Sequence, residues 1–297
     1  MTEELTRRQH YVPQFYLRNF LDNSQTLYGY SRVKKTYFPC HTEDICRKDW
    51  LYEICLQNTT PHDKKFMLPN CIEKSFADKE GMFDSLFRRI VGICDDSANR
   101  NALIFSTKEK IILHKFVLNL LFRNPWSLNQ TGDNRLIQYI MQDDRLKPIE
   151  ELLNELSLKD RYEPLVRIAN QQVWLDDSLP GGIQEKLIAQ LNSMHFCILK
   201  SDNDSFITSD FPILYDPFKK RDMPLFKTIF FSISPKYAII YSQSNDAKRY
   251  RNRIRDLSNK GDIISQLNKW YLGQNVERSK FLFAKNKYTL SSIVNRR

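Results

Sequence analysis

The residues best suited to chemistry lie near the start of the chain, where residues 10–20 read HYVPQFYLRNF. His10, Gln14 and Arg18 recur every four residues in a segment that is otherwise mostly apolar and aromatic. Pro13 suits the first position of a helix, because it lacks an N–H and its φ is already helical. Gln14 and Arg18 then share one helix face, and His10 lies just ahead of the helix on the same side. The pattern predicts either a functional site or a buried polar network.

A second polar group follows a predicted strand, where residues 208–212 read TSDFP. Asp210 stands at the strand end, where a carboxylate can project into a cleft as a general base, a metal ligand or the partner of a histidine. The competing interpretation is a turn in which Ser209 and Asp210 bond to the backbone and fix the chain before Pro212. Taken by itself, this segment favours the turn.

Three further charged residues fall on predicted helices. Arg123 ends a helix just before Asn124-Pro125. The helix dipole favours a cation there, and a guanidinium at that place can hold an anion. Glu73 and Glu80 are seven residues apart and lie nearly on one face of their helix. Such a pair serves as a metal site or as acid and base, although surface glutamates are far more common.

The six cysteines predict reduced thiols, because a chain of this length forms an ample core without a disulfide framework. Structural zinc sites bring paired ligands two to four residues apart, and the chain has no Cys-x-x-Cys pair. We therefore interpret the cysteines and the neighbouring His41 as unliganded.

A strongly basic stretch reads KRYRNRIR from residue 248 onward and falls in a predicted helix over 246–273. Its charged residues are Lys248, Arg249, Arg251, Arg253 and Arg255. Tyr250 and Asn252 between them suit stacking and phosphate contacts on a single strand. The alternative is a solvated helix with Asp246 and Asp256 as local partners. Because the stretch coincides with a net charge of +10, it favours an anionic partner, most often nucleic acid.

The periodicity of apolar residues changes along the chain. Residues 26–31 and 35–38 predict a hairpin, and residues 58–70 predict a polar loop. Helical spacing prevails from about residue 72 to 195, with an apolar helix that Thr107 opens as its cap and further helices at 133–143, 148–157, 160–171 and 182–193. Strand patterns follow at 195–199, 205–208, 228–232, 237–241 and 281–284.

These elements predict one α+β domain over residues 1–297, a mostly helical bulk with a small antiparallel sheet from the C-terminal third. Its parts are an N-terminal motif helix and hairpin over 1–70, a helical part over 71–193, and a strand-rich part with the basic helix over 194–297.

Composition excludes several classes of protein. With only 8 glycines in 297 residues, the chain has neither a Gly-x-Gly-x-x-Gly pattern nor a P-loop, which argues against dinucleotide and P-loop nucleotide sites. No apolar signal core follows Met1, and the most apolar run is too short to span a bilayer. We therefore expect a cytoplasmic protein with no membrane association.

The motifs together resemble a widespread microbial family catalogued as domain of unknown function 4238. Its hallmark is the opening His-x-Val-Pro-Gln-x-Tyr-Leu-Arg-x-Phe, which residues 10–20 match. Weaker matches are Arg123-Asn124-Pro125, residues 208–212, Ser234-Pro235 and Asn268. Phe211 replaces the asparagine of the family's Ser-Asp-Asn-Pro. The resemblance covers most of the chain and implies that one site contains His10, Gln14, Arg18, Arg123 and Asp210.

The first hypothesis for function is a hydrolase acting on nucleic acid or a nucleotide, a defence or toxin-like effector. His10 would be the general base or acid, and Asp210 would orient it or bind Mg²⁺ or Mn²⁺ together with Glu80. Phosphate would be neutralised, and water or substrate positioned, by Arg18, Arg123 and Gln14. Phosphodiester hydrolysis needs mainly positioning and charge neutralisation, which these residue types supply.

The second hypothesis is a non-catalytic module that binds nucleic acid or protein through the basic helix 246–273, with a protein partner or a second copy of the chain. In that case His10 and Asp210 belong to a buried structural network. A third hypothesis is a transferase or glycohydrolase acting on a nucleotide cofactor, which requires neither metal nor polymer.

Overall fold

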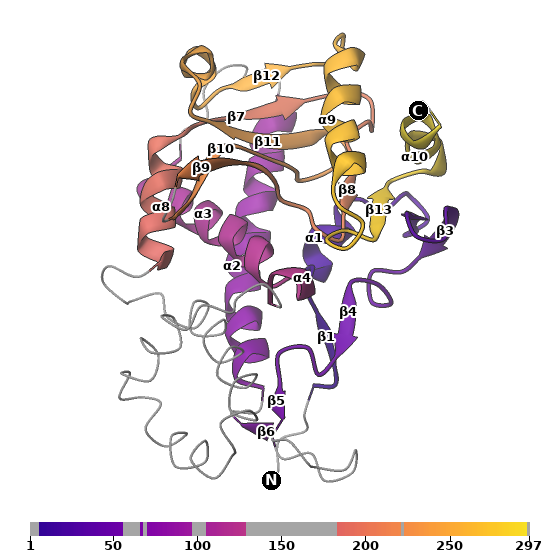
Figure 1. Ribbon diagram of the computed structural model, residues 1–297. Coiled ribbons are helices and arrows are strands. Elements are labelled where there is room, and N and C mark those ends of the chain that lie inside the picture. Colours follow the sequence, from indigo (N-terminus) through magenta and orange to yellow (C-terminus); the bar gives the residue numbers. More distant parts are fainter. Residues whose placement is uncertain are drawn as a thin grey trace.

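Two larger β-sheets organise the parts of the chain that the computed structural model describes, which are residues 6–55, 66–67, 70–96, 105–128, 183–220 and 223–295 (Figure 1). The five-stranded sheet has the order β12-β7-β11-β10-β9. Its strands are β7 (His195–Lys200), β9 (Leu214–Lys220), β10 (Met223–Ser232), β11 (Tyr237–Ser242) and β12 (Ile254–Asp256). β12 pairs with β7 in parallel, and the other pairs are antiparallel.

The four-stranded sheet joins the two ends of the chain in the order β3-β2-β13-β8. Its strands are β2 (Leu27–Ser31), β3 (Thr36–Cys40), β8 (Thr208–Ser209) and β13 (Phe281–Ala284). The predicted hairpin is confirmed as β2 and β3, which pair in antiparallel register. Gly29 is required there because a Cβ at this position would lie 2.5 Å from the Phe38 ring of the partner strand.

Two short ladders complete the strands. β1 (Arg8–His10) pairs with β4 (Arg47–Asp49), and β5 (Ile54–Cys55) pairs with β6 (Phe66–Met67). β1 brings the polar start of the opening motif against residues 47–49, and the chain then enters the first helix. Pro13 proves to be the N-cap of that helix and not its first residue.

The described helices are α1 (Gln14–Arg18), α2 (Cys71–Asp95), α3 (Thr107–Phe122), α4 (Pro125–Leu128), α8 (Ile183–Ser193), α9 (Gly261–Gly273) and α10 (Lys287–Val294). α2 runs from the β5–β6 ladder towards the five-stranded sheet, where Tyr237 of β11 donates a hydrogen bond to Asp95 (Figure 1). α8 confirms the helix predicted at 182–193. The helices predicted at 133–143, 148–157 and 160–171, and most of the loop predicted at 58–70, lie outside the described residues.

α3 lies in the centre of the core, as its apolar sequence predicts, with Phe116 and Val117 fully buried. Its start differs by one residue from the prediction, because Ser106 and not Thr107 is the N-cap. The Ser106 side chain accepts a hydrogen bond from the Glu109 N–H, and Glu109 accepts one from the Ser106 N–H. This reciprocal capping box satisfies two N–H groups, one more than the N-cap side chain satisfies by itself.

The prediction of a small antiparallel sheet from the C-terminal third is wrong, although the α+β class holds. One sheet has five strands and is mixed, and the other places β13 between β2 and β8. Because β2 and β3 come from residues 27–40, N-terminal residues supply half of that sheet. Strand pairing at such separations depends on which edges meet in space, which local periodicity does not encode.

The basic helix predicted over 246–273 is also wrong. The structure divides this range into a 3₁₀ helix η2 (Asn245–Tyr250), β12 and α9. Asn252 has a φ of 55°, which ends the helical path. The following backbone then pairs with β7, since the N–H of Ile198 bonds to the Arg253 carbonyl at 3.0 Å. The open edge of β7 thus takes up residues that local propensity assigned to a helix.

Within the described residues, no helix is both long and apolar enough to cross a membrane.

Candidate functional site

His10 is the last residue of β1, and its backbone carbonyl and its imidazole ring have different surroundings. Its backbone carbonyl accepts hydrogen bonds from Arg123 Nη2 at 2.6 Å and from the Tyr52 hydroxyl at 3.2 Å. Its ring atom Nε2 is buried and has no hydrogen-bond partner among the described residues. Burial lowers the pKa of His10 and Arg123 lowers it further, against a hydrogen bond to the Glu43 backbone that raises it. The imidazole is therefore neutral at pH 7 and has the form of a base.

Arg123 is the C-cap of α3, and its guanidinium lies inside the protein with 1% of the residue exposed. Its Nη1 bonds to Glu80 Oε1 at 2.8 Å and to Asn119 at 3.3 Å, and its Nε bonds to the Tyr52 hydroxyl at 3.3 Å. The guanidinium also lies 4.2 Å from the centre of the Phe76 ring. The Arg123 guanidinium, which was predicted to hold an anion, thus bonds to protein partners and connects β1, α2 and α3.

Glu73 and Glu80 on α2 have different electrostatic environments. Glu80 forms the ion pair with Arg123, and its side chain is 29% exposed. Glu73 has one carboxylate oxygen, Oε1, that is buried and without a hydrogen-bond partner in the described part of the chain. Burial raises the pKa of Glu73 to about 7, and the charges of Glu80 and Glu53 add to the rise while Arg123 opposes it. The helix α2 therefore carries an ion-paired carboxylate and, about two turns earlier, a carboxyl that titrates near neutral pH.

Tyr52 and Glu53 complete the surroundings of His10, and sequence reasoning missed both. Tyr52 bonds to Arg123 and to the His10 carbonyl, as described above. Glu53 is buried and accepts a hydrogen bond at 2.8 Å from Gln9, the residue just before His10. Gln9 in turn accepts one from the Tyr52 N–H at 2.7 Å. The segment around Tyr52 carries no motif, so only its tertiary contacts reveal its role.

Gln14 and Arg18 share one face of α1, as predicted. Arg18 Nη2 donates to Gln14 Oε1 at 3.0 Å, and Arg18 is exposed. The other face of α1 is buried through Phe15, Tyr16 and Leu17. Gln14 and Arg18 thus remain available to a ligand at the surface.

Asp210 is 3% exposed and uses its carboxylate to hold the start of β13. Oδ1 accepts bonds from the Ser279 hydroxyl at 2.9 Å and the Phe281 N–H at 3.1 Å, and Oδ2 accepts one from the Lys280 N–H at 3.1 Å. Burial raises the pKa of Asp210 to about 6, although these hydrogen bonds lower it. The carboxylate thus serves segment 279–281, while the charges acting on the His10 ring come from Arg123, Arg47 and Glu80.

The family-like motifs do meet in space, through backbone and hydroxyl contacts. Asn124 donates to the Asp210 carbonyl at 2.8 Å, which connects the Arg123-Asn124-Pro125 motif to residues 208–212. The Tyr16 hydroxyl donates to the Ser232 carbonyl at 2.6 Å and lies 2.7 Å from the Thr208 hydroxyl. Asn268 bonds to Ser205 and Ile207 at 2.7 and 3.3 Å. These contacts give the weaker motifs a structural role.

The predicted metal ligands Asp210 and Glu80 have separate partners, the segment 279–281 and Arg123. Among the described residues, no three His, Cys, Asp or Glu side chains are close enough together to hold a metal ion. Cys40, Cys46, Cys94 and Cys197 are free thiols.

The predicted nucleic-acid-binding residues lie on and beside β12. Lys248, Arg249, Arg251 and Arg253 are exposed, and Arg255 is half-buried on the strand itself. β12 lies at the end of the molecule opposite to β5, β6 and the start of α2, where Glu73 stands (Figure 1). The basic residues and the cluster of His10, Glu73, Glu80 and Arg123 are therefore two separate candidate sites.

Comparison with known proteins gives one match. A family model described as "Protein of unknown function (DUF4238)" matches residues 8–287. No curated protein and no solved structure matches the chain.

Proposed function

The chain belongs to the DUF4238 family of proteins of unknown function, and from its own side chains we propose that it is a hydrolase acting on nucleic acid or a nucleotide. The observation that carries the proposal is that a neutral base and a carboxyl of raised pKa are both under the influence of one buried arginine. His10 Nε2 and Glu73 Oε1 are both buried without a partner in the described residues, and Arg123 acts on the pKa of both groups. Groups with opposed shifts in pKa are typical of catalytic acid and base pairs.

In the proposed reaction, His10 Nε2 takes a proton from water, and the water oxygen attacks phosphorus. The P–O bond to the leaving group breaks, and Glu73 gives its proton to the leaving oxygen. Arg123 is a positioning residue, since its bonds to Glu80 and the His10 carbonyl fix α2 against β1. Both reacting atoms are buried, so a substrate must displace the side chains around them.

The net charge of +10 supports an anionic substrate, because a positive field raises the rate of encounter with phosphates. The exposed Arg18 and the half-buried Gln14 offer polar groups on the helix that follows His10. The proposed substrate therefore contacts α1 at the surface and reacts beside β1 and α2.

The test is a cleavage assay on labelled RNA, single-stranded DNA, duplex DNA and nucleoside phosphates, with and without Mg²⁺ or Mn²⁺. We expect His10→Ala and Glu73→Gln to lower the rate by at least about a hundredfold, the usual contribution of a general acid or base. Asp78→Asn, an exposed carboxylate on the same helix, is the matched control and should keep the full rate. Equal activity in all four proteins would refute this site.

A second candidate function is a binding module that uses the exposed residues beside β12. The supporting observation is that Lys248, Arg251 and Arg253 lie exposed at one end of the molecule, far from the proposed acid and base in Figure 1. Tight binding of nucleic acid without cleavage under every condition would favour this function over the hydrolase.

Salt dependence distinguishes specific phosphate contacts from a general effect of charge. Arg251→Gln with Arg253→Gln should lower the slope of log affinity against log salt by about 0.9 per contact on duplex DNA. The control removes two exposed lysines elsewhere, Lys34→Gln with Lys269→Gln, at equal net charge. If both pairs change the slope equally, the β12 region is not the binding surface.

A further inference from the structure

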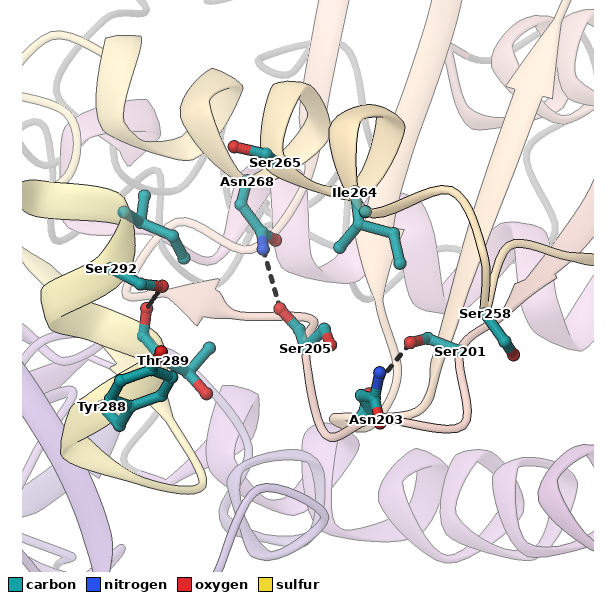
Figure 2. A pocket seen from close by; sticks show the side chains of 12 residues that line it. Ser201, Asn203, Ser205, Ser258, Ile264, Ser265, Asn268, Tyr288, Thr289 and Ser292 are labelled. Atoms are coloured by element: carbon teal, nitrogen blue, oxygen red, sulfur yellow. Dashed lines mark hydrogen bonds between the residues drawn. The ribbon is translucent and has the colours of Figure 1, made fainter. Parts of the chain in front are cut away.

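A pocket with a volume of about 180 Å³ lies between the segment 201–205, the start of α9 and the helix α10 (Figure 2). A single buried water requires only about 10–15 Å³ of such space. The pocket therefore has room for a small organic ligand. None of its lining residues belongs to the cluster around His10 or to the basic residues near β12.

Hydroxyl groups dominate the lining, which includes Ser201, Ser205, Ser258, Ser265, Thr289 and Ser292. Two carboxamides, Asn203 and Asn268, add further donors and acceptors. Ile264 and Ile293 supply an apolar part of the wall. Hydroxyls and amides both donate and accept hydrogen bonds, so this lining complements a ligand whose own groups also do both.

Part of this hydrogen-bonding capacity is already fixed by the fold. Asn268 donates to the Ser205 carbonyl at 2.7 Å, and Ser201 donates to the Asn203 carbonyl at 2.9 Å (Figure 2). The Asn268 bond holds the segment 201–205 against α9, and the Ser201 bond lies within that segment. The hydroxyls of Ser258, Thr289 and Ser292 also donate to groups of the chain. The hydroxyls of Ser205 and Ser265 donate no hydrogen bond within the described residues, so they are available to a ligand.

No lining residue carries a charge, and two carboxylates near the pocket have partners of their own. Asp204 forms an ion pair with Lys285 at 2.7 Å. Asp256 accepts bonds from the Ser258 N–H and hydroxyl at 2.8 and 2.6 Å. The pocket thus offers an ion no opposite charge, and a neutral ligand enters it without the cost of removing water from a charge.

An aromatic ring lies beside these hydroxyls. Tyr288, near the start of α10, lines the pocket with 81% of the residue exposed. An exposed aromatic ring next to converging polar groups can cover the apolar face of a ring-shaped ligand while the hydroxyls bond its edge.

We propose that this pocket binds a neutral sugar ring, carried by a free saccharide or by a nucleoside. A sugar ring combines an apolar face for Tyr288 with several hydroxyls that each donate and accept, and it carries no charge. The proposal stands independently of the hydrolase proposed above, because the two sites share no residue.

The experiment is saturation-transfer NMR and calorimetry on the full chain with ribose, glucose, uridine, adenosine and uridine monophosphate. We expect a neutral sugar compound to bind with a Kd below about 10 mM, the range of weak specific ligands. Binding of glucose or ribose identifies a saccharide site, and binding of uridine or adenosine alone identifies a nucleoside site. Absence of binding by all four neutral compounds would overturn the proposal.

A pair of glycine variants on α9 locates the binding. Gly261 lines the pocket, and a Cβ placed there meets no atom within 4 Å, so Gly261→Leu adds a bulky side chain at the pocket wall from an unhindered Cβ. Gly273 at the other end of α9 has the same freedom and lies outside the lining, so Gly273→Leu is the control. We expect Gly261→Leu to weaken binding at least about tenfold and Gly273→Leu to leave it unchanged. Equal affinity in both variants would refute the location.

Tyr288→Ala tests the aromatic contact in a residue too exposed to affect folding. It should weaken binding by about fivefold or more, the loss typical of one stacked ring. If uridine monophosphate instead binds more than tenfold tighter than uridine in a salt-dependent way, the pocket is an anion site and the proposal is wrong.

Discussion

The carboxyl group of Glu73 titrates near neutral pH because burial opposes its charge. Its pKa is about 7 in the folded chain, above the ordinary value of 4.5. Between these two values the folded state binds more protons than the unfolded state, so stability falls as pH rises. A carboxylate stabilised by a salt bridge has the opposite effect, because it makes stability rise with pH. The pH dependence of stability therefore distinguishes a buried Glu73 carboxyl from an ion-paired one.

We therefore predict that Glu73→Gln, which removes the ionisation, stabilises the protein at pH 8 by about 1–3 kcal/mol and has little effect at pH 5. Thermal unfolding at the two pH values measures the difference, and Asp78→Asn on the same helix is the control. A loss of stability at pH 8 would mean that the Glu73 carboxylate is ionised and paired.

Two buried tyrosines allow a matched test of a single hydroxyl group. Tyr16 and Tyr241 are both fully buried, but only the Tyr16 hydroxyl has partners, Thr208 and the Ser232 carbonyl. Tyr16→Phe leaves that carbonyl unpaired and should cost about 1–3 kcal/mol of unfolding free energy. Tyr241→Phe removes a hydroxyl with no partner in the described chain and should be neutral or stabilising. Urea unfolding compares them, and equal losses would contradict the structure.

At the scale of elements, the start of α3 depends on the capping box of Ser106 and Glu109. Ser106→Ala should destabilise the protein by about 1 kcal/mol, because the first turn loses an acceptor for the Glu109 N–H. Thr107→Ala, the residue that the sequence suggested as the cap, should change stability by much less. Chemical unfolding of both variants decides which residue caps the helix.

The strand β13 depends in the same way on one distant side chain. Asp210 accepts hydrogen bonds from Ser279, Lys280 and Phe281, where the chain enters β13. β13 then pairs with β2 on one side and β8 on the other. This structural role of the Asp210 carboxylate accounts for a polar residue next to the buried Phe211, and it requires no catalytic role for Asp210.

At the scale of the whole molecule, Arg123 connects β1, α2 and α3 through His10, Glu80 and Asn119. Arg123→Met should cost about 3–5 kcal/mol, because it removes one member of a buried ion pair. In that background Glu80→Gln should cost less than it does in the natural chain, and a double-mutant cycle by urea unfolding measures the coupling. Additive effects would show that the pair contributes no coupling energy.

The arrangement of charge is also a property of the whole molecule. The exposed basic residues lie beside β12, and the proposed acid and base lie towards the opposite end (Figure 1). The sequence by itself did not show that the two groups of residues lie apart. Their separation depends on the tertiary structure, in which β12 joins the edge of the five-stranded sheet. The two proposed functions can therefore be tested by variants that do not affect each other.

Local sequence determined the elements whose signals lie within a few residues. The turn between β2 and β3, the apolar stretch of α3 and the apolar run of β13 each specify their own conformation. The opening motif also specified a short helix with one polar and one buried face. Hydrophobic periodicity, turn residues and caps act over short separations, so a single sequence contains them.

Tertiary structure alone decided the sheet partners and the state of the charged groups. β12 is a strand because β7 offers an open edge, and the pKa of Glu73 is raised because burial in the fold opposes its charge. The sequence motifs placed Arg123 and Asp210 in one site with His10. In the structure, Arg123 binds His10 and Glu80, whereas Asp210 binds the start of β13. Burial and electrostatics depend on residues distant in sequence, and only the folded chain brings these together.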